Sequence, residues 1–229
     1  MATFVVVHGA WTAGWSWKKM HPLMAERGHR LITPTMTGLG ERAHLARPDV
    51  DLETHIADIL GVLEFEELSG VNLIGHSYGG MPATGVADRA RERIAQLIYL
   101  DAMVPQDGEC ALDILPESIR AHRKVGADGL VPPQGMPADT APEDRAWSEP
   151  KRRPQPARTQ EQKLRLHNGP LTLPRHYIYC TRTTPDDRFG PFYARAKREG
   201  WGNYEIDSSH NPHITTPVVL ADLLDRIAV

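Results

Sequence analysis

One short motif restricts the fold of this chain more than any other feature. The apolar run Val71–His76 leads directly into Ser77, and Gly75 and Gly79 flank that serine in the pattern Gly-x-Ser-x-Gly. Where a strand turns sharply into a helix at such a serine, the backbone is strained, the hydroxyl is exposed and the glycines leave room for the turn. The pattern alone is common, so its meaning depends on the elements around it. We expect a nucleophile elbow at Ser77.

Strands and helices alternate over most of the chain. The first apolar run, residues 3–8, is continuous and rich in β-branched residues, as in a strand buried on both faces of a parallel sheet. We expect strands at residues 3–8, 29–33, 71–76, 95–100, 176–181 and 203–207, and helices at residues 15–26, 52–63, 78–93, 191–199 and 217–227. This alternation predicts an α/β fold, in which helices flank a mostly parallel sheet.

The alternation stops between residues 103 and 170. This segment contains many prolines and no long amphipathic run. Segments of this kind often lie over a site on a rigid scaffold and supply contacts to its substrate. We therefore expect residues 103–170 to be a short cap inserted into one core, formed by residues 1–102 and 171–229. A disordered linker is the alternative.

Composition narrows the possible partners. The formal net charge of −3 on 229 residues gives no reason to expect nucleic acid or an anionic membrane surface. Two cysteines, Cys110 and Cys180, are too few for a disulfide framework. No stretch has the length of a transmembrane helix, and the N-terminus lacks the basic region of a signal peptide. We expect a cytoplasmic protein whose partner is a small molecule, and the oligomeric state stays open.

A nucleophilic serine requires a base, because its hydroxyl is a poor nucleophile at neutral pH. Among eleven histidines, His210 fits best because it directly follows the last expected strand. The loops after parallel strands share one edge of the sheet, so His210 is expected at the same edge as Ser77. His213 is the rival. Nothing nearby resembles a set of metal ligands, and we expect neither a metal nor an organic cofactor.

These motifs resemble those of the α/β-hydrolases, and more narrowly the small branch that contains plant methyl-ester hydrolases and hydroxynitrile lyases. The resemblance rests on His8-Gly9-Ala10-Trp11, Gly14-Trp15-Ser16-Trp17, Gly75-His76-Ser77-Tyr78-Gly79, Leu100-Asp101-Ala102-Met103-Val104-Pro105, and Ser209-His210 ahead of Pro217. It implies that Ser77 is the nucleophile and His210 the general base. It also implies an oxyanion hole made by the backbone amides of Ala10 and Tyr78. Trp11 follows Ala10 and is expected in the wall of the substrate pocket.

The acid of the triad is where this chain departs from the plant pattern. That pattern has an aspartate directly after the strand equivalent to residues 176–181, whereas Asp186 and Asp187 lie a few residues later here. Asp101 instead ends the apolar strand that follows the nucleophile. A buried carboxylate there is costly unless it is paired, and the Nδ1 proton of His210 is a suitable partner. We favour Asp101, with Asp187 and then Asp186 as alternatives.

The expected activity is that of a serine hydrolase that cleaves small carboxylic esters through an acyl-enzyme. Aryl or xenobiotic esters, carbamates and amides stay open because they react through the same tetrahedral chemistry. Hydroxynitrile lyases of this branch carry a lysine shortly after the catalytic histidine. Here Asn211-Pro212 follow His210, so we do not expect lyase activity. A cofactor-free dioxygenase or a small-molecule receptor on the same fold is the alternative, since a fold alone does not fix a function.

Overall fold

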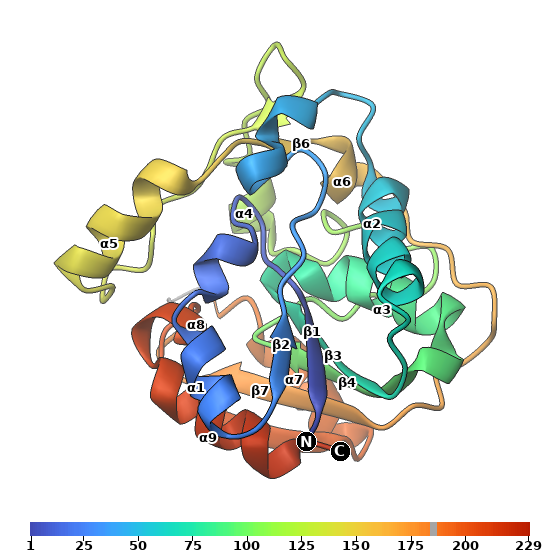
Figure 1. Cartoon of the computed structure of the whole chain (residues 1–229). Coiled ribbons are helices and arrows are strands. Elements are labelled where there is room, and N and C mark those ends of the chain that lie inside the picture. The colour runs from blue at the N-terminus through green and yellow to red at the C-terminus, as the bar shows by residue number, and fades with distance from the viewer. Residues whose placement is uncertain (184–186) are drawn as a thin grey trace.

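The computed structural model describes residues 1–183 and 187–229, and within them one six-stranded parallel sheet forms the centre of the molecule (Figure 1). Its strand order is β2-β1-β3-β4-β7-β8. The strands are β1 (Thr3–Val7), β2 (Arg30–Ile32), β3 (Val71–His76), β4 (Ile94–Leu100), β7 (Arg175–Cys180) and β8 (Gly202–Ile206). The chain runs from β1 outward to β2 and then returns to β3 on the other side of β1. Ligands of such sheets bind at the carboxyl ends of the strands beside this reversal.

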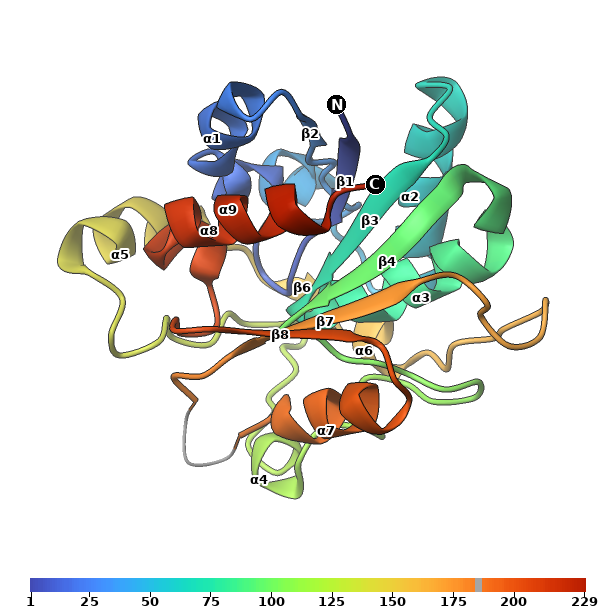
Figure 2. The same cartoon turned by 90° about the horizontal axis from the view of Figure 1, so that it is seen from below.

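Helices cover both faces of the sheet (Figures 1 and 2). One face carries α1 (Met20–Glu26) and α9 (Pro217–Ile227), and the other carries α2 (Leu52–Phe65), α3 (Gly80–Arg89) and α7 (Gly190–Arg198). Side chains alternate along each strand. Phe4 and Val6 therefore pack on the face covered by α1 and α9, whereas Val5 and Val7 pack on the face covered by α2, α3 and α7. The predicted α/β fold is confirmed.

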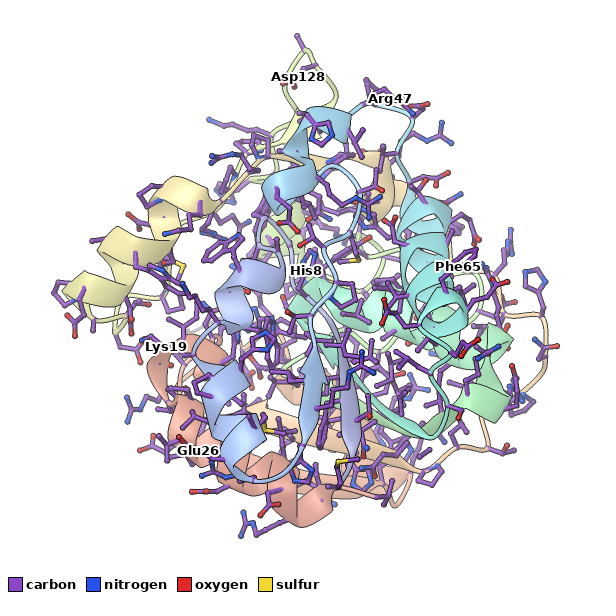
Figure 3. All side chains as sticks on the ribbon, in the orientation of Figure 1. His8, Lys19, Glu26, Arg47, Phe65 and Asp128 are labelled. Carbon is purple, nitrogen blue, oxygen red and sulfur yellow. The ribbon has the colours of Figure 1, made fainter. Side chains whose placement is uncertain are left out.

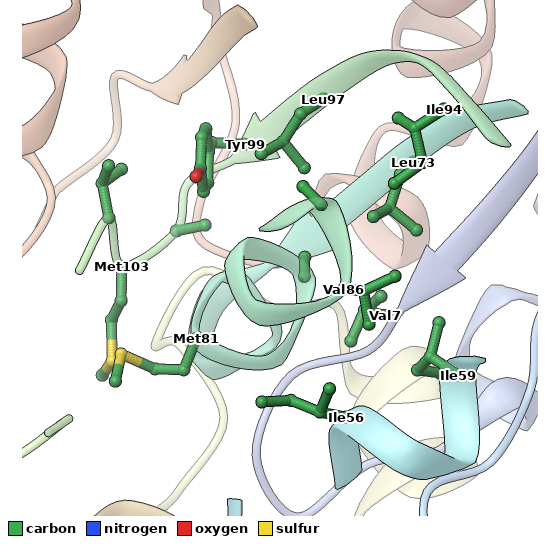
Figure 4. Packing of buried hydrophobic residues seen from close by; sticks show 14 of the residues in the cluster. Val7, Ile56, Ile59, Leu73, Met81, Val86, Ile94, Leu97, Tyr99 and Met103 are labelled. Atoms are coloured by element: carbon green, nitrogen blue, oxygen red, sulfur yellow. The ribbon is translucent and has the colours of Figure 1, made fainter. Parts of the chain in front are cut away.

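The larger core lies between α3 and its neighbours. Helix α3 packs against the sheet on one side and against α2 on the other (Figure 4). The side chains that meet there belong to three groups: Met81 and Val86 of α3, Ile56 and Ile59 of α2, and Leu73, Leu97 and Tyr99 of the strands. All are buried, which fixes the helix that follows Ser77 against the sheet.

Two expected helices are shorter than the sequence pattern indicated. The helix expected over residues 15–26 divides into a 3-10 turn, Gly14–Trp17, and α1, which begins at Met20. Pro22 explains the division, because proline is tolerated only in the first turn of a helix. The helix after Ser77 ends at Arg89, and a 3-10 turn over Arg91–Arg93 leads into β4.

Residues 103–170 contain short elements that lie beyond the carboxyl ends of the strands (Figure 1). They are α4 (Glu117–Arg120), β5 (Leu130–Val131), α5 (Pro142–Ser148), a 3-10 turn (Glu149–Lys151), β6 (Gln155–Pro156) and α6 (Arg158–Glu161). Strands β5 and β6 pair with each other in antiparallel fashion. The remaining elements are 3-10 turns at Gly40–Leu45 and Ser77–Gly79, and α8 (Pro212–Thr215). No helix among the described residues combines the length and apolar character needed to cross a bilayer.

Candidate active site

Ser77 lies in the turn between β3 and α3. Its φ is +55°, in the left-handed region that non-glycine residues rarely adopt. A Cβ on Gly79 would lie 2.0 Å from the carbonyl oxygen of Val7, so only glycine fits there. The amide of Met103 donates to the carbonyl oxygen of Ser77 at 3.1 Å. The surrounding backbone therefore holds the strained conformation in place.

A chain of hydrogen bonds joins Ser77, His210 and Asp101. His210 Nδ1 lies 2.7 Å from Asp101 Oδ2, and His210 Nε2 lies 2.8 Å from Ser77 Oγ. With the Nδ1 proton donated to the carboxylate, Nε2 accepts the proton of the serine hydroxyl. The His210 ring also stacks on Phe189, with 4.8 Å between ring centroids and 7° between planes. His76 Nε2 donates to the carbonyl oxygen of His210 at 2.8 Å, so both ring and backbone are oriented.

Asp101 is held in a buried and strained turn after β4. Its φ is +41° and its exposed fraction is 4%. The second carboxylate oxygen, Oδ1, accepts from the amide of Cys180 at 3.2 Å. The Tyr177 hydroxyl bonds both the amide and the carbonyl of Ala102, at 3.0 and 2.8 Å. Burial raises the pKa of Asp101, and the hydrogen bond with His210 acts in the opposite direction.

Asp187 has other partners. Its Oδ2 accepts from the Tyr179 hydroxyl at 2.8 Å, and its Oδ1 accepts from the amide of Gly190 at 2.9 Å. Both bonds hold the segment that leads into α7. Asp187 lies in the wall of the same cavity as His210, but the carboxylate that is hydrogen-bonded to the His210 ring is that of Asp101. The other alternative, Asp186, lies outside the described residues.

Ala10 and Tyr78, the two residues expected to form an oxyanion hole, lie in the same cavity wall as Ser77. Ala10 follows β1, and Tyr78 opens the turn Ser77–Gly79, where the first backbone N–H groups of a helix have no intrahelical partner. Both residues line a cavity together with Ser77. The Tyr78 side chain points into the core, where its hydroxyl bonds His55 Nδ1 at 3.0 Å. Its backbone amide is therefore the group available to this site.

Trp11 connects the loop after β1 to residues 103–170. Its φ is +61°, its amide donates to Gln155 Oε1 at 3.1 Å, and its indole Nε1 donates to the carbonyl oxygen of Val131 at 3.0 Å. Gln155 and Val131 belong to the small sheet of β6 and β5. The sequence placed Trp11 in the pocket wall, but it gave no signal for these partners because they lie 144 and 120 residues away along the chain.

Two cavities meet at Ser77. The first, here called the His210 cavity, has a volume of about 300 Å³ and contains His210 and Asp101 in its wall. The second, here called the Met103 cavity, has a volume of about 240 Å³ and is lined by Met103 and Tyr78. The walls that they share are formed by Ala10, Trp11, Ser77, Gln134, Arg188 and Phe189. Ser77 therefore borders both cavities.

His213, the rival base, belongs to the packing behind the site. Its ring stacks on Trp17 at 4.5 Å and 9°. Neither of its ring nitrogens has a hydrogen-bond partner among the described residues, and burial lowers the pKa of His213 to about 3. Within residues 1–183 and 187–229, no three histidine, cysteine or acidic side chains are grouped so as to hold a metal ion.

Comparisons with known proteins agree with this architecture. Residues 4–223 match the alpha/beta hydrolase family. The chain is 38% identical over 244 aligned positions to the carbendazim hydrolyzing esterase of a Nocardioides species, and the match covers 98% of both proteins. It is 31% identical over 117 residues to putative methylesterase 14 of Arabidopsis thaliana, covering 51% of this chain and 34% of that protein. An extracellular alpha/beta-hydrolase from a Paenibacillus species has the same fold, with a TM-score of 0.84, 22% identity and coverage of 100% and 99%.

The chain therefore belongs to the alpha/beta hydrolase family. Within it, the chain is an enzyme of the carboxylic ester hydrolase class, related to the branch that includes the plant methylesterases. The expected resemblance to that branch is confirmed.

Proposed function

We propose that the protein hydrolyses small carboxylic esters with Ser77 as nucleophile, His210 as general base and Asp101 as the acid of the triad. The observation that carries this proposal is the unbroken hydrogen-bonded chain from Asp101 Oδ2 through His210 to Ser77 Oγ, with links of 2.7 and 2.8 Å. Nucleophile, base and orienting group must lie within such distances for acyl transfer.

The reaction proceeds in two halves. Ser77 Oγ attacks the ester carbonyl while His210 Nε2 takes its proton, and a tetrahedral intermediate forms. Its carbon–oxygen bond to the alcohol then breaks as His210 returns the proton to the leaving oxygen. Water repeats the cycle on the acyl-enzyme, and Ser77 is regenerated with release of the carboxylic acid. Each backbone donor of Ala10 and Tyr78 contributes about 3 kcal/mol by stabilising the oxyanion.

Residues 103–170 are proposed to act as a cap over this site. The support is that Trp11, which adjoins the proposed oxyanion residue, bonds Gln155 and Val131 of this segment. Trp11 and Phe189 give both cavities aromatic walls. The relative that is 38% identical is named a carbendazim hydrolyzing esterase. The proposed substrates are aryl and apolar esters, and also aryl carbamates, because carbamates react through the same tetrahedral chemistry.

The proposal is tested with p-nitrophenyl esters of increasing acyl length and one aryl carbamate. We expect a burst of p-nitrophenol equal to the enzyme concentration, because an acyl-enzyme accumulates on Ser77. A fluorophosphonate should abolish turnover and leave its phosphonyl group on the peptide that contains Ser77. A label on Ser148 or Ser209, which also lie in the wall of the His210 cavity, would contradict the assignment of the nucleophile. Oxygen uptake on a heteroaromatic compound, or tight binding without turnover, would favour the dioxygenase or the receptor.

Replacing each candidate acid in turn by asparagine shows which of them is the acid of the triad. In Asp101→Asn, the amide no longer holds the Nδ1–H tautomer of His210 or stabilises the imidazolium, so we expect kcat to fall by about 10⁴-fold. In Asp187→Asn, an acceptor for Gly190 is retained and the contact between His210 and Asp101 is untouched, so kcat should stay far closer to that of the native enzyme. The measurement is kcat on one p-nitrophenyl ester, with enzyme quantified by fluorophosphonate titration. The opposite order of the two losses would make Asp187 the acid.

A further inference from the structure

The two cavities differ in their access to His210. The His210 cavity contains the histidine in its wall, whereas the Met103 cavity contains Ser77 and Tyr78 but not His210. In the proposed function, on which this inference rests, His210 delivers a proton to the oxygen of the leaving alcohol. That oxygen must lie beside His210, so the His210 cavity receives the alcohol. The acyl group then extends into the Met103 cavity.

The inner wall of the Met103 cavity is apolar. It is formed by Met103, Ala111, Leu112, Leu115, Ile119 and Val131. Its volume of about 240 Å³ exceeds the roughly 150 Å³ of an engineered apolar cavity that binds benzene. An acyl group with the bulk of a phenyl ring or a medium-length chain therefore fits, and the site is larger than a simple acetyl group requires.

The same cavity also presents positive charge. Arg120, Arg123 and Lys124 line it together with His122, and among the described residues no aspartate or glutamate does. Two of these cations have carboxylate partners: Glu161 pairs with Arg123 at 2.9 Å, and Glu117 pairs with Arg120. The arginines line the cavity and these two glutamates do not, so the cations are the groups that a bound ligand meets.

Arg123 is the most firmly positioned of these cations. Its side chain is 15% exposed, Nε donates to Gln160 Oε1 at 3.2 Å, and Nη2 donates to the carbonyl oxygen of Ala157 at 3.3 Å. The wall of the His210 cavity mixes both signs of charge, because Asp101 and Asp187 lie in it together with Arg152, Arg182 and Arg188. The Met103 cavity has cations in its wall and, among the described residues, no carboxylate, so an anionic group is better accommodated on the acyl side.

We propose that the Met103 cavity binds an apolar acyl group that ends in a carboxylate, so that preferred substrates include monoesters of dicarboxylic acids. Hydrolysis consumes one water, breaks the bond between the carbonyl carbon and the alcohol oxygen, and releases the alcohol, a dicarboxylate and one proton. The distal carboxylate lies at Arg123 and Lys124, where charge-assisted hydrogen bonds are the strongest available contacts.

The test compares two p-nitrophenyl esters of an eight-carbon acyl chain that end in a carboxylate or in an isosteric, neutral carboxamide. The six-carbon pair is run beside them, and shorter acids are avoided because their carboxylate attacks its own ester. We expect kcat/KM to favour the carboxylate by about tenfold or more at low ionic strength, and the ratio to shrink as salt screens the contact.

Two variants locate the charge. In Arg123→Gln and in Lys124→Gln, the ratio of kcat/KM for carboxylate to carboxamide should fall toward one. Because Arg123 also anchors residues 157–161, Lys124→Gln keeps the test informative if Arg123→Gln does not fold. Lys163→Gln is the matched control, since this exposed lysine lies outside both cavities, and it should keep the native ratio.

Each contrary result has a separate meaning. Equal turnover of both esters, with fluorophosphonate-sensitive activity, would overturn this inference and leave the proposed function intact. An unchanged ratio in both variants would overturn the placement of the carboxylate. A preference for a carboxylate on the alcohol side, measured with 4-carboxyphenyl and 4-carbamoylphenyl esters, would overturn the assignment of the cavities. No turnover of any ester would overturn the proposed function as well.

Discussion

Ser77→Ala is expected to lower kcat for p-nitrophenyl ester hydrolysis by about 10⁶-fold. The substitution removes the attacking oxygen while the amides of Ala10 and Tyr78 stay in place, so a residual rate above that of water should persist. Alanine keeps a Cβ at φ +55°, so the backbone strain and the packing of α3 should change little. The measurement is steady-state kcat together with thermal unfolding, which should show a similar Tm for both proteins.

A double variant distinguishes a triad from independent contributions. His210→Ala should lose about as much activity as Ser77→Ala, and the double variant should lose no more than either single one, because residues that act as a unit are not additive. Ser118→Ala, which removes an exposed serine, controls for general effects of substitution. Losses that multiply in the double variant, or a His210→Ala enzyme that keeps most of its rate, would contradict the proposed roles.

The fold was predictable because its signals are local. Apolar runs of strand length alternate with helical periodicity, and this alternation specifies a parallel sheet with helices on both faces. The turn at Ser77 was also predictable from a local motif. The approach of the Val7 carbonyl oxygen leaves room only for glycine at position 79, and this requirement appears in the sequence as the second glycine of Gly-x-Ser-x-Gly. His210 followed from topology, since its loop ends at the same edge of the sheet.

The rest of the site depends on contacts that leave no local pattern. Which carboxylate faces His210 is decided by the positive φ of Asp101 and by the bonds of Asp187 to Tyr179 and Gly190. The stacking of Phe189 on His210 joins residues from different loops. Residues 103–170 lack a periodic pattern. The sequence therefore predicted neither the Met103 cavity nor the arginines in its wall. Composition can indicate a cap, but only packing decides which of its side chains face the substrate.

The second large effect is expected on stability rather than on rate, and it arises from buried histidines. His8, His55, His76 and His213 are all fully enclosed, and His8 lies near the middle of the view in Figure 3. Burial lowers the pKa of His8 and of His55 to about 4 and that of His213 to about 3. Burial, reinforced by the neighbouring histidines, also lowers the pKa of His76 well below its usual value. These side chains are neutral in the folded protein.

Neutral buried histidines make the folded state sensitive to acid. An unfolded histidine has a pKa near 6.5, so between about pH 6.5 and 4 the unfolded chain binds more protons than the folded one. Stability therefore rises with pH across this window and is lost as pH falls through it. From pH 7 to pH 5, each of His8, His55 and His213 costs about 2 kcal/mol, or about 6 kcal/mol for the three. His76 acts in the same direction. The total for the three is comparable to the whole unfolding free energy of about 5–15 kcal/mol for a typical domain.

We therefore expect the midpoint of urea unfolding to fall steeply from pH 7 to pH 5, with the native state largely lost near the lower value. His213→Phe isolates one contributor. The phenyl ring keeps the stacking on Trp17 and gives up no hydrogen bond, because neither nitrogen of His213 has a partner among the described residues. This variant should lose about 2 kcal/mol less than the native protein between the two pH values. His44→Gln, which replaces an exposed histidine, should keep the native dependence. Equal unfolding free energies of the native protein at pH 7 and pH 5 would show that these histidines are charged, or accessible to protons, in the folded state.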